Sequence, residues 1–113
     1  MSLDVSLYFD ECEHCGQSSE VFSANITHNL ANMADAAGIY GAVWRPDENG
    51  YETAGELIEP LTRGIAAMKA DPKSFKKLNS SNGWGLYESF LPWLEKYLDA
   101  CVKYPKAQIS VSR

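Results

Sequence analysis

The stretch LDVSLYF, residues 3–9, decides the fold class because apolar and polar side chains alternate along it. The apolar positions are Leu3, Val5, Leu7 and Phe9. This period of two is typical of a β-strand with one buried face. Downstream, EVFSAN (20–25) predicts a second strand, and the turn-rich DECEHCGQSS (10–19) would join the two as a hairpin.

The other end of the chain also predicts a strand. In AQISVS (107–112), Ile109 and Val111 alternate with polar neighbours. Because both ends are strands, we expect the last to pair beside the first and complete a small antiparallel sheet.

Helical patterns fill the middle of the chain. NITHNLANMADAAG (25–38) predicts a helix with Asn25 or Thr27 as its N-cap, and IYGAVWRPDENGYE (39–52) is expected to be irregular. Further helices follow from a capping box at Thr53 and Glu56, from Asp71-Pro72, and from the apolar stripe within residues 86–104. Pro60 would kink the first of these or mark a later start.

The predicted fold class is therefore α+β, in one domain spanning residues 1–113. A small antiparallel three-stranded sheet, made of the N-terminal hairpin and the C-terminal strand, would be covered on one face by three to four helices.

Composition excludes several classes of function. With 45% hydrophobic and 22% charged residues, the chain resembles an ordinary soluble globular protein. It has no apolar run long enough for a bilayer and no signal-peptide pattern, which predicts a cytoplasmic location without membrane partners. The net charge of −5 argues against nucleic-acid backbone binding, which needs a surplus of lysine and arginine.

Cys12 and Cys15 form a C-x-x-C-G knuckle in the predicted hairpin turn. Thiolates at this spacing can bind one zinc ion, so a structural zinc that staples the hairpin is one interpretation. The chain has three cysteines and no second pair, although a structural site needs four ligands. An inert turn is the preferred interpretation, and a redox pair is the third.

His28 is the one histidine placed on a predicted helix, on the face away from the apolar stripe and at helical spacing from Asp35. A histidine oriented by a carboxylate is a common general base. The sequence indicates no nucleophile, so an ordinary exposed histidine is preferred over a catalytic one.

Aromatic, cationic and amide residues fall in two segments, around Trp44-Arg45 and in NSSNGWGLYE (79–88). An indole beside a guanidinium can stack on and hold a planar anion, but the same residues can instead plug the helical layer while Arg45 caps a carboxylate. Trp84 would either fold back onto the core, which is preferred, or form a second pocket wall. The candidate ligand-binding residues are Asn29, Trp44, Arg45, Asn79, Asn82 and Trp84.

Three segments together resemble a family of small bacteriophage and prophage proteins. They are SANITHNLANMADAAGIYGAVWRP (23–46), NGWGLYE (82–88) and YLDACVKYPKAQISVSR (97–113). The resemblance covers nearly the whole chain but implies no activity, cofactor or site residue. It implies a protein made in a bacterial cytoplasm that acts on a host component.

Three functional hypotheses follow. The first is a binding protein that sequesters a small planar or anionic, nucleotide-like ligand in the Trp/Arg/Asn pocket. The second is a protein–protein inhibitor or adaptor, with aromatics and Arg45 as anchors. The third is a small enzyme that uses His28 and Asp35. Of these, the binding class is preferred, with a small molecule and a host protein as equal candidates for the partner.

Overall fold

The computed structural model describes residues 2–10, 18–79 and 86–112, and its three strands form one antiparallel sheet. Strands β1 (Ser2–Asp10) and β2 (Ser18–Thr27) form the hairpin, and β3 (Gln108–Ser112) pairs with the opposite side of β1. The strand order is thus β2-β1-β3. The predicted α+β class and the pairing of the last strand with the first are confirmed.

The alternation in β1 separates two faces of the sheet. Leu3, Val5 and Leu7 are completely buried on the face that meets the helices. On the open face Asp4 accepts a hydrogen bond from Asn25 across the β1–β2 pair, at 2.7 Å. Opposite residues of neighbouring strands share a face, so the polar positions of all three strands gather on that open side.

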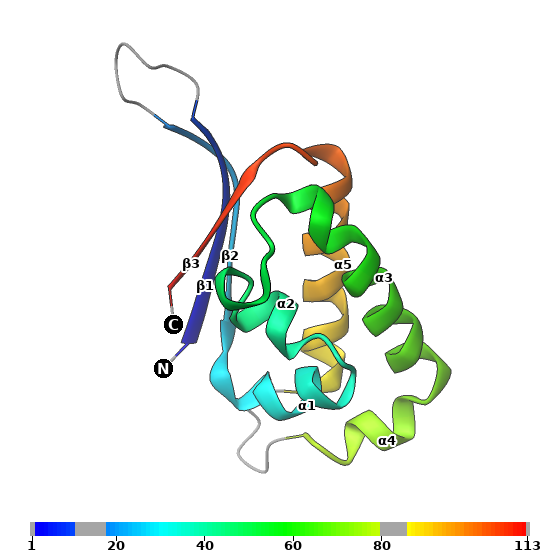
Figure 1. Cartoon of the computed structure of the whole chain (residues 1–113). Coiled ribbons are helices and arrows are strands. Elements are labelled where there is room, and N and C mark those ends of the chain that lie inside the picture. The colour runs from blue at the N-terminus through cyan, green and yellow to red at the C-terminus, as the bar shows by residue number, and fades with distance from the viewer. Residues whose placement is uncertain (1, 11–17, 80–85, 113) are drawn as a thin grey trace.

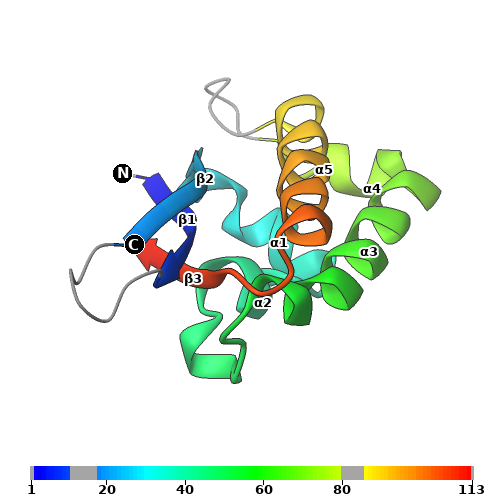
Figure 2. The ribbon, with the colours of Figure 1, turned by 90° about the horizontal axis from the view of Figure 1, so that it is seen from above.

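Figures 1 and 2 show the helices packed on one face of the sheet. The described chain contains five α-helices and two short 3-10 helices, where the sequence predicts three or four. They are η1 (His28–Leu30), α1 (Ala31–Ala36), α2 (Tyr40–Trp44), η2 (Asp47–Asn49), α3 (Ala54–Ala70), α4 (Pro72–Lys76) and α5 (Tyr87–Lys103).

The first helical region differs from its prediction. Strand β2 continues through Thr27, so the residues before η1 are extended rather than helical. Ile26 is buried as a strand residue opposite Leu3. Its apolar side chain is needed for the buried face of the strand, and its position also matches the spacing of a helical stripe. Thr27 does act as an N-cap, because its Oγ1 accepts a hydrogen bond from the Asn29 amide.

The segment 39–52 is also more regular than predicted. Helix α2 forms there, and its buried face contains Val43 and Trp44. The Val43 amide donates to the Ile39 carbonyl at 3.0 Å, one helical turn back. Little more than one helical turn forms here, which is too short for a periodic sequence pattern to be visible.

The later helices begin where their capping residues predict. Thr53 and Glu56 form the capping box of α3, which begins at Ala54, so Pro60 lies inside the helix and marks no later start. Asp71 caps α4 by accepting from the Ser74 amide. These caps satisfy amides that have no partner within the helix itself.

The buried side chains of the sheet and helices form one continuous core. Helix α5 contributes Phe90, Leu94 and Tyr97, and the ring of Tyr97 stacks on Phe22 of β2 with 5.7 Å between centroids. Within the described ranges, the helices lack the combination of length and apolarity that crossing a bilayer requires.

Candidate functional site

Trp44 lies in the core rather than on the surface. Its side chain is 2% exposed and stacks on Tyr40, with 5.8 Å between ring centroids, while Phe90 meets it edge-on. Helix α2 turns the indole inward to fill the space between the helices. This position agrees with the interpretation that Trp44 plugs the helical layer, since a ligand has no indole face to stack on here.

His28 contacts Trp44 instead of Asp35. The indole Nε1 donates a hydrogen bond to His28 Nδ1 at 2.9 Å. Indole is a donor only, so Nδ1 of His28 is the acceptor in this bond. His28 therefore satisfies a buried indole N–H, which would otherwise be costly to leave unpaired.

The predicted pairing of His28 with Asp35 is not formed in the described part of the chain. Because β2 extends through Thr27, His28 lies in η1 and not on α1 with Asp35. Among the described residues no hydrogen bond joins His28 to Asp35, and Asp35 is exposed on α1. A general base oriented by this carboxylate has no geometric support.

Arg45 is held by its own neighbours. Its Nε donates to the Tyr40 hydroxyl at 3.2 Å, and its guanidinium forms an ion pair with Glu48. The hydrogen bond to Tyr40 and the pairing with Glu48 raise the pKa of Arg45 above its ordinary value. Arg45 thus caps a carboxylate, as one of the two sequence interpretations predicts.

The predicted amide residues separate into different places. Asn79 Oδ1 accepts a hydrogen bond from the Tyr87 amide at 2.8 Å and so holds the first turn of α5. Asn29 is exposed in η1. Asn82 and Trp84 lie outside the described residues, so the complete Trp/Arg/Asn pocket stays a prediction.

Cys12 and Cys15 also lie outside the described residues, and the zinc knuckle stays a prediction. Elsewhere in the structure, over 2–10, 18–79 and 86–112, no three His, Cys, Asp or Glu side chains come together as metal ligands. Cys101 is fully buried on α5, and burial raises the pKa of its thiol to about 12. Cys101 therefore remains a neutral thiol at physiological pH.

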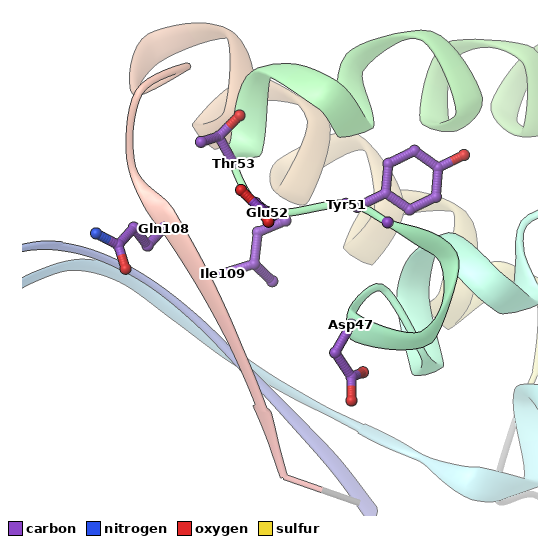
Figure 3. A pocket seen from close by; sticks show the side chains of 7 residues that line it. Asp47, Tyr51, Glu52, Thr53, Gln108 and Ile109 are labelled. Carbon is purple, nitrogen blue, oxygen red and sulfur yellow. The ribbon is translucent and has the colours of Figure 1, made fainter.

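A pocket of about 560 Å³ opens beside β3, between that strand and the segment 47–53 (Figure 3). It is lined by Asp47, Gly50, Tyr51, Glu52, Thr53, Gln108 and Ile109. In Figure 3, Glu52 and Ile109 lie beside each other where β3 meets the segment 47–53, and the Asp47 side chain projects downward from the neighbouring turn.

Backbone hydrogen bonds position this segment. The amides of Asn49 and Tyr51 both donate to the Pro46 carbonyl, and Gly50 closes the turn with a φ of 80°. Farther on, Glu56 Oε1 accepts from the amides of Glu52 and Thr53, at 3.0 and 3.1 Å. The turn and the capping box therefore fix both ends of the pocket wall.

The same segment covers the first part of the β3 edge. The Ile109 amide donates to the Glu52 carbonyl at 3.3 Å, and the Ala54 amide donates to the Ala107 carbonyl at 2.9 Å. The ladder goes no farther toward residue 112, because the Glu52 amide bonds to Glu56 and not to Ile109. The pocket lies where the two backbones separate.

Beyond Ile109, no backbone group of the described residues pairs with the outer edge of β3. The Ile109 amide points away from β1, and with the period of two along a strand the Val111 amide and carbonyl point the same way. Strand β3 has the sequence QISVS, with no charge, no proline and no shift of register against β1. Charges, prolines and bulges are the features that usually prevent a strand edge from pairing with another chain, and β3 lacks all three.

The other edge of the sheet does carry such devices. Strand β2 has a bulge, since Leu7 pairs with Phe22 and Tyr8 with Glu20. The Trp93 indole of α5 also donates to the Asn25 carbonyl of β2 at 3.1 Å. The two edges therefore differ, and β3 presents the less protected one.

A second hollow of about 270 Å³ lies between β2 and α5. It is lined by Val21, Phe22, Lys96, Asp99, Ala100, Lys103 and Tyr104. Both charge signs occur in this lining, so it indicates no particular ligand chemistry.

No sequence motif singles out the residues that line the pocket beside β3. Asp47 and Glu52 flank the Asn49-Gly50 turn, and the capping box that follows marks where this turn must end. Their position beside β3 depends on the bridge between residues 53 and 108, which no local pattern predicts.

The comparisons with known proteins find no similar family model, curated protein or solved structure. The resemblance to small phage proteins therefore stays a prediction.

Proposed function

We propose that this chain is a protein-binding module, an inhibitor or adaptor that takes up an extended segment of its partner along β3. The observation that carries the proposal is the open outer edge of β3 beyond Ile109. A strand added to such an edge binds through backbone hydrogen bonds, and neighbouring pockets select its side chains.

The arrangement around β3 supports strand addition. Residues 52–54 already form an isolated antiparallel bridge with 107–109, so the start of this edge pairs with a second segment of the chain itself. A partner segment would continue that short ladder past Val111 toward the end of β3. The pocket at the junction provides space for its side chains, with both polar and apolar lining.

The small-molecule hypothesis has weaker support. Trp44 is buried and Arg45 is paired with Glu48, so neither presents the stacking or anion-binding surface that a nucleotide-like ligand needs. The predicted phage origin and bacterial cytoplasmic location add context, since a partner would then be a host protein.

A peptide-display selection on the full chain tests the proposal. Random ten-residue peptides should yield binders that contact β3, and Val111→Pro should weaken them at least about tenfold because proline lacks the outward amide. Val111→Ala is the matched control, since it removes the side chain but keeps the amide, and it should retain most of the affinity.

The proposal is wrong if Val111→Pro folds and binds the selected peptides as well as the parent chain does. It is equally wrong if exchange protection by these peptides maps to other elements and leaves the Val111 amide unchanged.

A further inference from the structure

We infer that the partner segment alternates in polarity, with a valine or isoleucine opposite Val111 and a polar residue on either side of it. This inference rests on the proposed function and specifies the chemistry of the partner. It follows from the rows of side chains that cross the sheet, from the outward backbone groups of β3, and from the segment that already pairs with the start of this strand.

Two rows of apolar side chains cross the helix-facing side of the sheet and end at β3. They consist of Ala24, Val5 and Val111 in one row, and of Phe22, Leu7 and Ile109 in the other. The β1 members are completely buried, whereas Ile109 and Val111 pack against the core but stay half-buried. Because covering apolar surface is favourable, an aliphatic side chain on an added strand is favoured as the next member of the Val111 row.

The opposite face of the sheet carries polar rows. They consist of Ser23, Ser6 and Ser110 in one row, and of Asn25, Asp4 and Ser112 in the next. Successive side chains of a strand point to opposite faces, so the partner residues on either side of the aliphatic one project onto this polar face. Serine or threonine suits these positions, since hydroxyl groups of neighbouring strands can pair.

The backbone of β3 determines which partner residue is the aliphatic one. The Val111 amide and carbonyl both point away from β1, so in an antiparallel pair the partner residue opposite Val111 exchanges hydrogen bonds with it. The preceding outward amide, that of Ile109, already donates to the Glu52 carbonyl. A slip by one residue would turn the polar side chains of the partner toward the helices, so the alternation and the register specify each other.

The pocket beside β3 gives the aliphatic side chain space. Its lining includes Tyr51 and Ile109, which are both half-buried. A partner residue opposite Val111 is a diagonal neighbour of Ile109, at about 7–8 Å. Valine and isoleucine suit this position because β-branched side chains pack well on a half-buried pleated surface.

The chain itself shows the same alternation on the adjoining part of the edge. Ala54, whose amide donates to the Ala107 carbonyl, is completely buried together with Ala107. The next residue of this segment, Thr53, is polar and forms the bridge with the exposed Gln108. Glu52 ends the alternation where the two backbones separate, and Ile109 beside it is left half-buried.

A second copy of this chain is a poorer occupant of the edge. Its β3 has a matching alternation in QISVS, but the start of that strand is also covered by residues 52–54 of its own chain. Self-pairing would bring the segment 47–53 of both copies up to one short edge. An extended segment of another protein carries no such cover, so it fits the edge better.

The experiment uses the peptides selected on the full chain, each aligned with β3 by NMR contacts. We expect valine or isoleucine to be enriched at the position aligned with Val111, with polar residues on both sides. Replacing the aligned valine by threonine keeps its shape but adds a hydroxyl, and it should weaken binding about three- to fivefold. Replacing a neighbouring threonine by valine is the matched control and should change affinity less than about twofold.

A change in the chain tests the same contact from the other side. Ile109→Thr should weaken the valine peptide more than the threonine peptide, because it removes apolar surface that only the valine uses. Val102→Thr, at an exposed position on α5, is the matched control and should affect both peptides equally. The peptide substitutions are measured on the unaltered chain, so they decide the question even if Ile109→Thr does not fold.

The outcomes separate the two claims. Peptides that protect the Val111 amide but show no aliphatic preference, or that respond equally to substitution at the aligned and the neighbouring positions, overturn this inference and leave strand addition intact. Peptides that leave the Val111 amide unprotected overturn the proposed function itself. A concentration-dependent dimer that protects the Val111 amide without any peptide identifies a second copy as the occupant and overturns the inference.

Discussion

At the scale of single residues, the buried hydroxyl of Tyr97 gives the sharpest test of the packing. This group is completely buried and has no hydrogen-bond partner among the described residues. Burial also raises the pKa of Tyr97, so the group stays a neutral phenol. Leaving a buried hydroxyl unpaired costs roughly 1–3 kcal/mol.

Tyr97→Phe should therefore raise the free energy of unfolding, by roughly 1 kcal/mol, in urea denaturation. Tyr87→Phe is the matched comparison, because the Tyr87 hydroxyl is buried and donates to the Met68 carbonyl at 3.0 Å. That change should lower stability by roughly 1 kcal/mol. A loss of stability in Tyr97→Phe would mean that its hydroxyl has a partner after all.

The role of a single residue could be predicted from the sequence where its side chain interacts only with residues close to it in the chain. Asp71 before Pro72 predicts a cap, and the structure contains that cap. The role of His28 could not be predicted in the same way. Its hydrogen bond to Trp44 joins positions 16 apart, and it depends on β2 ending at Thr27.

At the scale of elements, the capping box links the start of α3 to the pocket wall. Glu56 accepts hydrogen bonds from the amides of Glu52 and Thr53, and these bonds lower the pKa of the Glu56 carboxyl from its ordinary 4.5. The stabilisation is present above that ordinary pKa and is lost as the pH falls through the lowered value.

Glu56→Gln should consequently lower the melting temperature more at pH 7 than at pH 3. Below the ordinary pKa this stabilisation is lost progressively, so parent and variant should melt at more similar temperatures at pH 3. Thermal unfolding of both proteins across this pH range measures the difference. Equal separation of the two melting temperatures at both pH values would contradict the role given to the ionised carboxylate.

Helices and strands could be predicted from the sequence where they are long enough to show a clear hydrophobic periodicity. The long amphipathic stretch before residue 104 predicts α5, and the alternation in residues 3–9 predicts β1. Helix α2 has five residues, so its apolar positions span little more than one turn and show no periodicity.

At the scale of the whole molecule, the strand order could be predicted because strands begin and end the chain around a helical middle. The pocket could not, since Asp47 and Glu52 come to lie beside Ile109 through the bridge between Thr53 and Gln108. The predicted ligand site depended on Trp44 being at the surface. Aromatic residues near turns fit both surface and core, and packing decides between them.

Backbone amide exchange along β3, measured by NMR with and without a selected peptide, tests the central claim most directly. The Val111 amide points outward, so it should exchange rapidly in the free protein, while the Ser110 and Ser112 amides pointing toward β1 are protected. Peptide binding should slow the exchange of the Val111 amide at least about tenfold. The open edge is contradicted if the Val111 amide is already as protected as the Ser110 amide in the free protein. The proposed use of the edge is contradicted if peptide binding leaves the exchange rate of the Val111 amide unchanged.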